Sequence, residues 1–188
     1  MNTRPYHFVE LEQGTSAWLT WRQKGIGASD APIIMRENPW KEPSELLEEK
    51  RCLSPQTFEN KAMQIGTALE PMARESYMTR MKTVVSPACL QSGTHSWLRA
   101  SVDGIASDGS SVVEIKCGES VYKKTSQSKK VPAYYYGQLQ HILAVTGLQT
   151  IDFWCFQLLC PEVLVKVQRN ESYIERLLVA EEAFFNSI

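Results

Sequence analysis

The sequence predicts an α/β (α+β) domain in which a central mixed sheet is flanked by helices. The hydrophobic pattern has a helical period in the first third of the chain and turns alternating and β-branched in the middle. A helix, two strands and a final helix then follow. The chain has 188 residues, 43% hydrophobic and 22% charged, as in ordinary globular proteins. Neither a repeat nor a flexible linker interrupts it, so we expect a single domain over residues 1–188.

The first third of the chain carries helix signals. Thr15 or Ser16 can cap a first helix, and Gly25 follows it where a C-terminal glycine belongs. In the longest candidate helix, Gly66 and Pro71 mark a break or a new start. The helices expected in this part cover residues 18–24, 30–36, 43–51 and 60–81.

The rest of the chain alternates between strand and helix patterns. Pro132 opens and Gly147 closes a helix over 133–146. A polar, Lys-rich stretch over 118–130 is expected to be partly loop. The strands expected here cover residues 83–86, 98–106, 110–117, 150–159 and 163–167, with a hairpin turn at 107–111, and an amphipathic helix over about 171–187 ends the chain.

Charge and composition exclude several classes of protein. The formal charge of −1 and a pI near 6.3 argue against a small, strongly basic nucleic-acid-binding module. The charges are segregated, however, because residues 116–130 hold five lysines and one glutamate. From residue 152 onward there are three Lys or Arg and six Asp or Glu. This pattern still allows a DNA enzyme whose catalytic charge comes from a bound metal.

The same sequence predicts an intracellular, cytoplasmic protein that does not enter a membrane. No apolar run reaches the roughly 18 residues that a membrane span needs, and the first residues lack the apolar stretch of a secretory signal. The five cysteines are scattered without a C-x-x-C pair, which is typical of buried thiols in a reducing compartment.

Charged side chains converge in the middle of the chain. Glu114 and Lys116 are two residues apart on a strand and therefore share a face. A hairpin of residues 102–106 with 111–117 brings Asp103 to the same place. Hard carboxylate oxygens suit Mg²⁺, and the lysine can orient or deprotonate a water bound there. Two alternatives remain at this point, namely a surface ion pair and simple turns at Asp103-Gly104 and Asp108-Gly109.

Four ordered motifs resemble one nuclease family. Ten residues separate Asp103 from Glu114-Ile115-Lys116, as in the PD-(D/E)XK signature. The surrounding motifs resemble the phage lambda exonuclease and YqaJ-type viral recombinase branch of that superfamily. They are LEQGTSAWLTWRQKGIGASDAPIIM, GTALEP, SVDGIASDGSSVVEIKC and YYYGQLQHILAVTG, which lie between about residues 9 and 147 of a nuclease core over about 9–168. The resemblance implies a restriction-endonuclease-like fold.

The resemblance also implies a metal site. By similarity, Asp103 and Glu114 are metal ligands, and the backbone carbonyl of Ile115 is a further one. Lys116 supports the attacking water, and Glu70 completes the site, directly, through water or at a second metal. From the residues alone, without the resemblance to the family, Glu70 would be interpreted as a solvated carboxylate on a helix. Val102 stands where the family often has proline, a position that shapes the backbone but ligates nothing.

Three further residues match active-site positions of the family, one of them catalytic and two of them in contact with the substrate. Gln138 matches a glutamine that closes the site, with Gln140 as a lesser candidate. Arg22 and Ser29 match the positions that hold the 5′-phosphate of DNA. A guanidinium fork suits phosphate oxygens, and a serine at a helix N-terminus adds donors. The alternative roles are a polar residue inside the fold for Gln138, a surface arginine for Arg22 and a helix cap for Ser29.

The function implied by the resemblance is exonucleolytic. We expect an Mg²⁺-dependent (Mn²⁺ also suits) 5′→3′ exonuclease, with one or two ions per site, that digests one strand of linear duplex DNA to 5′-mononucleotides. It leaves 3′ tails for phage-type recombination. The resemblance also implies a homotrimeric ring, a single-strand annealing protein as partner, and a phage or prophage origin. The alternatives are an endonuclease without an end requirement and a DNA-binding module with a vestigial site.

Other chemistry-bearing residues receive structural interpretations from the sequence. His141 is expected to be structural, and Trp18, Trp21 and Trp40 are expected in the core unless one wedges a duplex end. Four lysines are either a solvated loop or a patch that contacts phosphates, namely Lys123, Lys124, Lys129 and Lys130.

Overall fold

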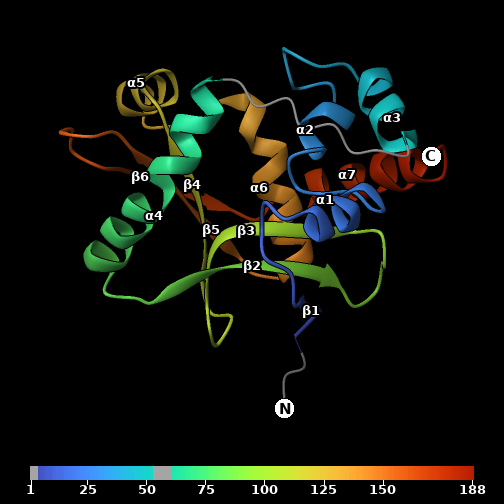
Figure 1. Ribbon diagram of the computed structural model, residues 1–188, viewed down its shortest axis with the longest axis horizontal. Helices are drawn as coiled ribbons and strands as arrows, with labels where there is room; N and C mark the ends of the chain where they lie inside the picture. Colours follow the sequence, from blue (N-terminus) through green and yellow to red (C-terminus); the bar gives the residue numbers. More distant parts are fainter. Residues whose placement is uncertain (1–3, 53–60) are drawn as a thin grey trace.

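The computed structural model describes residues 4–52 and 61–188, and a six-stranded sheet organises them (Figure 1). The strands lie side by side in chain order. They are β1 Tyr6–Val9, β2 Val85–Ser92, β3 Arg99–Ala106, β4 Val112–Cys117, β5 Thr150–Phe156 and β6 Val163–Gln168. Neighbours pair antiparallel except β4 and β5, which are parallel and connected through two helices. The predicted mixed sheet is therefore confirmed.

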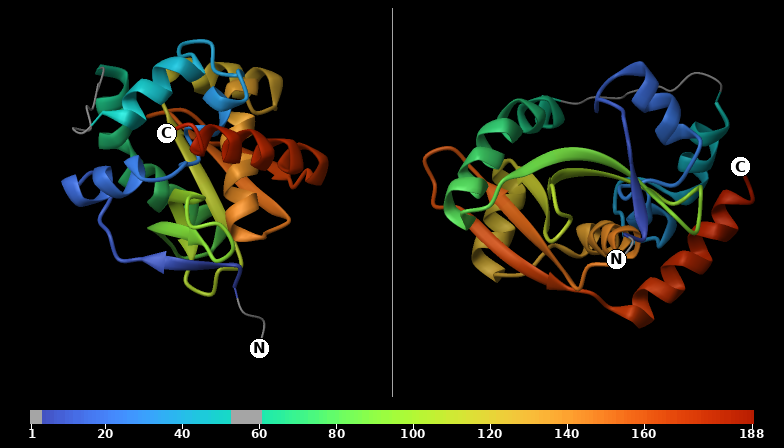
Figure 2. Two further views of the ribbon diagram at one scale, coloured as in Figure 1. Left: turned by 90° about the vertical axis from the view of Figure 1, so that its right-hand side faces the viewer. Right: turned by 90° about the horizontal axis from the view of Figure 1, so that it is seen from below.

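Helices cover both faces of the sheet (Figure 2). They are α1 Ser16–Gln23, α2 Ala31–Ile34, α3 Pro43–Arg51, α4 Lys61–Met81, α5 Glu119–Ser128, α6 Ala133–Thr146 and α7 Glu171–Phe185. Leu139 and Ile142 of α6 belong to one buried cluster, and Tyr77 of α4 belongs to another. Along β4, Val112 packs in the α6 cluster while Val113 packs in the α4 cluster. Alternation along this strand therefore sends Glu114 and Lys116 to the α6 face.

The β3–β4 hairpin resolves one alternative from the sequence. Gly109 lies in the turn with φ +73°, so Asp108-Gly109 is the hairpin turn. Gly104 instead lies inside β3, opposite Val113 of β4. A Cβ atom there would stand 2.7 Å from Val85 Cγ2 and 2.8 Å from Val113 Cγ1, so only glycine fits. The reading of Asp103-Gly104 as a turn is wrong.

The observed elements differ from the expected ones in several places, among them the strand expected at 83–86, which is β2 Val85–Ser92. α4 runs through Gly66 and Pro71 without the expected break, although the proline removes one hydrogen bond from the helix. Residue 60 of that expected helix lies outside the described residues. The stretch expected to be partly loop is mostly α5, which begins after Gly118 and ends at Lys129 with φ +55°. The edge strand β1 was not predicted. None of the helices described is long and apolar enough to cross a membrane.

Candidate active site

The candidate site lies where the ladder between β3 and β4 stops. The two strands pair at Ile105–Val112 and Gly104–Val113 and at no further position. Directly before Gly104, the Asp103 side chain replaces the backbone pairing between the strands. Its Oδ2 accepts a hydrogen bond from the Ile115 amide at 2.7 Å. The end of the ladder therefore places the Asp103 carboxylate against β4.

Glu114 is the most enclosed acid of the site, with 2% of its surface exposed. Its Oε1 accepts hydrogen bonds from Lys116 Nζ at 2.5 Å and from Gln138 Nε2 of α6 at 2.6 Å. Its Oε2 is buried and has no hydrogen-bond partner among the described residues. Three residues predicted from the sequence are thus in direct contact.

The acids Asp103 and Glu114 and the cation Lys116 shift one another's pKa values. Burial, and then the charge of Asp103, raise the pKa of Glu114 to about 7, against the opposing effect of Lys116. Burial likewise raises the pKa of Asp103. Burial alone would lower the pKa of Lys116, but Glu114 and Asp103 raise it well above its usual range. The Tyr135 ring, 5.0 Å from Nζ, also faces the ammonium. Lys116 is therefore held protonated.

Glu70 lies near these acids but is engaged by an arginine. The guanidinium of Arg74, one helical turn further along α4, forms an ion pair with Glu70 Oε1. Its Nε donates a hydrogen bond to the Asp103 carbonyl at 2.7 Å. Burial and the charge of Asp103 raise the pKa of Glu70. The sequence analysis missed Arg74, although its i,i+4 spacing from Glu70 was a readable signal.

The donor set fits a divalent cation through two carboxylates. Within residues 4–52 and 61–188, no three His, Cys, Asp or Glu side chains lie close enough together to hold a metal. Asp103 is half-buried and Glu114 is buried, both have raised pKa values, and Glu114 Oε2 has no hydrogen-bond partner among the described residues. A hard divalent cation such as Mg²⁺ or Mn²⁺ would satisfy these oxygens. Glu70 would join them only on leaving Arg74.

A hollow of about 160 Å³ connects these acids to the N-terminal motif. Its walls include six of the residues expected from the sequence, namely Arg22, Ser29, Asp103, Glu114, Lys116 and Gln138. Arg22 Nη2 donates a hydrogen bond to Ser29 Oγ at 2.7 Å. The Arg22 guanidinium also lies 4.6 Å from the Trp18 ring centroid. Glu70 is not part of this wall.

A lysine with a buried side chain holds the segment between Arg22, at the end of α1, and Ser29. Lys50 of α3 donates hydrogen bonds to the carbonyls of Arg22 at 3.0 Å and Gly25 at 2.8 Å. Its Nζ also pairs with Asp30 Oδ2 at 2.7 Å, and that oxygen accepts the Gly27 amide at 2.9 Å. The sequence analysis missed Lys50, because nothing local links it to a turn more than twenty residues earlier.

Other candidates have different roles. Gln140 is buried and donates to the Gln168 carbonyl at 2.9 Å, so it is a structural residue. His141 is structural, as expected, because its ring bonds Glu181 Oε1 at 2.7 Å and the Arg99 carbonyl at 2.8 Å.

The expectation that three tryptophans belong to the core is wrong. Trp18 and Trp21 are half-buried in the wall of the hollow, and Trp40 is exposed.

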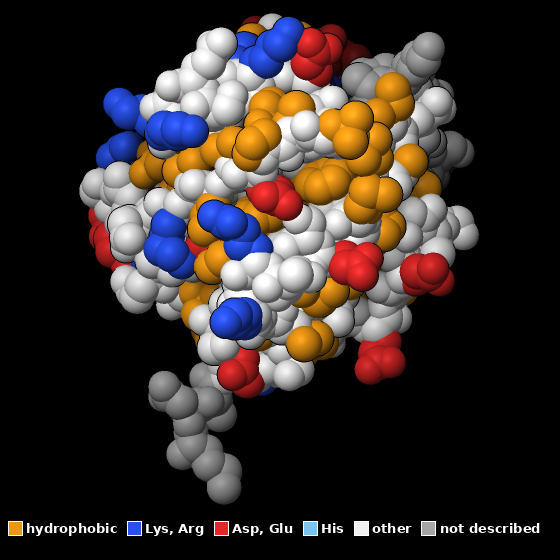
Figure 3. Space-filling view, turned by 90° about the vertical axis from the view of Figure 1, so that its left-hand side faces the viewer, with side chains coloured by type: hydrophobic (Ala, Val, Ile, Leu, Met, Phe, Trp, Pro, Cys, Tyr) orange, Lys and Arg blue, Asp and Glu red, His pale blue; other side chains and the backbone are white. Residues whose placement is uncertain are grey.

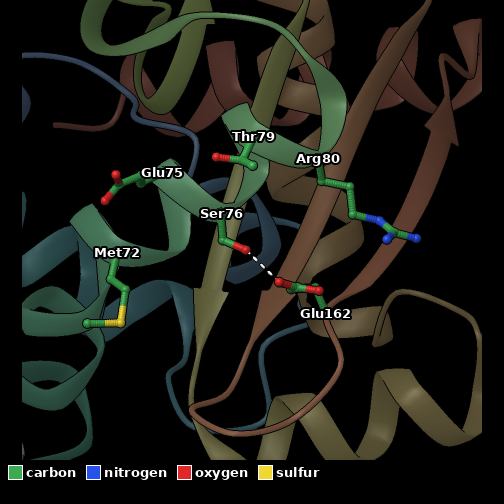
Figure 4. A pocket seen from close by; sticks show the side chains of 6 residues that line it. All are labelled: Met72, Glu75, Ser76, Thr79, Arg80 and Glu162. Carbon is green, nitrogen blue, oxygen red and sulfur yellow. Dashed lines mark hydrogen bonds between the residues drawn. The ribbon is translucent and has the colours of Figure 1, made fainter.

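A second, wider hollow of about 570 Å³ lies along α4 (Figure 4). Ser76 of α4 donates a hydrogen bond to Glu162 Oε1 at 2.6 Å across it. This bond lowers the pKa of Glu162, so its carboxylate is already satisfied. None of the residues predicted to carry the chemistry lines this hollow.

Comparison with known sequences points to one family. The family model of the YqaJ-like viral recombinase domain matches residues 17–149. The uncharacterized protein YqaJ of Bacillus subtilis (strain 168) is 28% identical over 180 residues, which are 93% of this chain and 56% of that protein. The uncharacterized protein R354 of Acanthamoeba polyphaga mimivirus is 27% identical over 158 residues, covering 77% of this chain and 29% of R354. The chain therefore spans about half or less of these relatives.

Solved structures share the fold. The alkaline exonuclease LHK-Exo from Laribacter hongkongensis matches with a TM-score of 0.80 and 27% identity, over 92% of this chain and 91% of that one. A phage-related exonuclease from Haemophilus somnus 129PT matches with a TM-score of 0.62 over 86% of this chain and 94% of that one. At 13% identity, the second match concerns the fold alone.

Proposed function

Because the chain belongs to the YqaJ-like viral recombinase family, we propose that it is a DNA nuclease, and specifically an Mg²⁺-dependent 5′→3′ exonuclease. Its substrate is linear duplex DNA, of which it digests one strand to 5′-mononucleotides and leaves 3′ tails for recombination. One observation carries the proposal: Arg22 and Ser29 open into the same small hollow as Asp103, Glu114 and Lys116. The likeness to an alkaline exonuclease supports it.

The residues of the hollow divide the reaction between them. Asp103 and Glu114 would hold Mg²⁺ or Mn²⁺, with the Ile115 carbonyl as a further ligand and Glu70 as another once it leaves Arg74. The metal would supply Lewis-acid chemistry for phosphodiester hydrolysis. Lys116 lies in the hollow beside Glu114, and its ammonium would orient the attacking water by donating a hydrogen bond to it. Gln138 fixes the Glu114 carboxylate by its hydrogen bond at 2.6 Å.

Arg22 and Ser29 set the place of cleavage. A guanidinium and a hydroxyl that already share a hydrogen bond can both turn their donors to a terminal phosphate. Because this pair lines the same hollow as the acids, a 5′-phosphate bound there presents a nearby phosphodiester to the catalytic groups. The strand is then shortened from its 5′ end.

Assembly and partners are proposed from the family resemblance. A homotrimer would need a surface for contact between copies. The face over α4 and the β5–β6 loop carries a band of hydrophobic side chains (Figure 3). Ile65, Met72, Leu158 and Leu159 are exposed on these two segments. A single-strand annealing protein is proposed as the partner that takes over the 3′ tail.

The test compares linear 5′-phosphorylated duplex with a covalently closed circle of the same sequence. We expect the wild type to digest the linear DNA in Mg²⁺ and to spare the circle. Lys116→Ala should lower the rate by at least about 100-fold, because a preorganised charge is lost. Lys166→Ala is the matched control, since Lys166 is also a strand lysine in an acidic pair but bonds Asp152 at 2.7 Å outside the hollow.

Two results would contradict the proposal. Equal cutting of the circle would favour the endonuclease, and full activity in Lys116→Ala would remove the site assignment. A DNA-binding module with a vestigial site would digest neither substrate.

A further inference from the structure

A group of aromatic and cationic side chains adjoins the candidate site, of which Trp40 and Lys124 are exposed and Tyr134 is half-buried. Trp40, in the loop between α2 and α3, is 68% exposed. Its ring meets the Tyr134 ring edge-on, with centroids 4.8 Å apart and planes at 73°. Lys124 Nζ of α5 lies 5.1 Å from the Tyr134 centroid. We call Trp40, Tyr134 and Lys124 the aromatic platform.

The platform is connected to the catalytic groups through one helix. Tyr134 and Tyr135 are neighbours in the first turn of α6, with ring centroids 4.7 Å apart. The Tyr135 ring faces Lys116 Nζ at 5.0 Å. An unbroken run of contacts thus leads from Lys116 outward to Trp40. Figure 1 shows the α2–α3 loop beside the beginning of α6, at the upper end of the molecule.

The charge around the platform favours a polyanion. Lys123, Lys124, Lys129 and Lys130 are all exposed, on α5 or directly after it. Lys123 pairs with Glu119 at 2.6 Å, but Lys124 directs its ammonium to the Tyr134 ring. Exposed rings flanked by lysines are how proteins bind single-stranded nucleic acid without reading its sequence. Bases stack on the rings, and the lysines meet the phosphates.

We propose that the aromatic platform binds unpaired bases of single-stranded DNA next to the active site. The inference rests on the proposed function, because it takes DNA as the substrate. Trp40 offers its exposed surface to a base, Tyr134 supports Trp40 from beneath, and Lys124 meets the phosphate. The Trp40 backbone N–H donates a hydrogen bond to Asn38 Oδ1 at 2.8 Å, within the loop between α2 and α3.

The experiment measures binding of a fluorescent oligothymidylate by anisotropy, with EDTA present to prevent cleavage. Trp40→Ala should weaken binding about 10-fold, and Trp40→Phe should retain most of it, because stacking requires a ring rather than an indole. Phe8→Ala is the matched control, since Phe8 is also an exposed aromatic, with the Arg4 guanidinium 5.5 Å from its centroid, but it lies on the edge strand β1. Phe8→Ala should bind as the wild type does.

Two outcomes would overturn the proposal. In one, Trp40→Ala binds the oligonucleotide as tightly as Phe8→Ala. In the other, Trp40→Ala loses binding only in step with a lower mass in sedimentation, so that the rings are a contact between copies. Digestion of linear duplex by the wild type, measured in parallel, reports on the nuclease separately. If the wild type does not digest the duplex while Trp40→Ala still lowers binding, the binding role of the aromatic platform is supported and the proposed nuclease function is contradicted.

Discussion

The two oxygens of the Glu114 carboxyl have different surroundings. Oε1 accepts from Lys116 and Gln138, whereas Oε2 is buried without a partner. A buried carboxyl whose pKa is raised to about 7 carries only part of its charge at neutral pH. The neighbouring acid Asp103 adds negative charge to that of Glu114 and contributes to raising its pKa. The arrangement costs folding energy by itself and is useful where a cation binds.

Arg74 is a positioning residue for this acidic cluster. It holds the Glu70 side chain and the Asp103 backbone carbonyl at the same time, from one position on α4. Losing it frees Glu70 and loosens the strand residue that carries a proposed metal ligand. Outer contacts of this kind typically contribute 10–100-fold to metal affinity or activity.

We therefore predict that Arg74→Ala lowers nuclease activity about 10-fold or more even at saturating Mg²⁺, because the Asp103 backbone loses its contact with the guanidinium, and that it changes the Mg²⁺ midpoint. Arg74→Lys should recover part of the loss, because an ammonium can pair with one of the two groups. Arg80→Ala is the control on the same helix. If Arg74→Ala and Arg80→Ala have the same Mg²⁺ midpoint, Arg74 has no role in positioning the acids.

At the scale of elements, the short turn between α1 and α2 depends on α3. The Lys50 ammonium reaches two carbonyls and one carboxylate of that turn, and both members of its ion pair are almost fully buried. Removing one partner of a buried pair leaves the other charge uncompensated, which costs about 3–5 kcal/mol. The helix therefore stabilises the turn that presents Arg22 and Ser29.

Replacing Lys50 tests this dependence. Lys50→Met should lower the free energy of unfolding by about 3 kcal/mol in a denaturant titration. Lys41→Met, which breaks the exposed pair of Lys41 with Glu49, should cost less than about 1 kcal/mol. Equal losses in the two variants would mean that the buried contacts of Lys50 stabilise nothing beyond an ordinary surface pair.

The same pair predicts a pH dependence of stability. Burial acts to raise the pKa of Asp30, but Lys50 and Arg22 lower it below its ordinary value of 3.8. A group with a lowered folded-state pKa contributes stability above its unfolded pKa and loses it as the pH falls through the folded value. The stability gap between wild type and Asp30→Asn should be full near pH 6 and shrink below about pH 4. An unfolding series that finds the gap constant down to pH 2 would contradict the ion pair.

At the scale of the whole molecule, the sequence predicted what depends on local spacing and on motif order. The hairpin that carries Asp103, Glu114 and Lys116 follows from strand periodicity and a short turn. The joining of that hairpin to Arg22 and Gln138 followed only from the family motifs, because the residues lie far apart in the chain. Lys50 was missed for the same reason, since its partners are set by packing. The contact of Arg74 with the Asp103 carbonyl is also set by packing, although its pairing with Glu70 is local.

Local signals were also overridden by packing. Pro71 stays inside α4 although proline usually ends a helix, because one face of this helix, including Ala73 and Tyr77, is buried against the sheet. The edge strand β1 has only four residues, too few for a periodic pattern to stand out.

The near-neutral charge of −1 conceals an exposed lysine group beside the site. Average composition therefore says little about the partner of this protein.

The central claim is that cleavage starts from a terminal 5′-phosphate held by Arg22 and Ser29. Its most direct test follows product release from linear duplexes labelled at either the 5′ or the 3′ end of one strand, with a 5′-phosphate or a 5′-hydroxyl. We expect the 5′ label to leave first as a mononucleotide, faster from the phosphorylated end, and Arg22→Ala to remove this preference. Release of the 3′ label first, or of long oligonucleotides regardless of the end group, would contradict it.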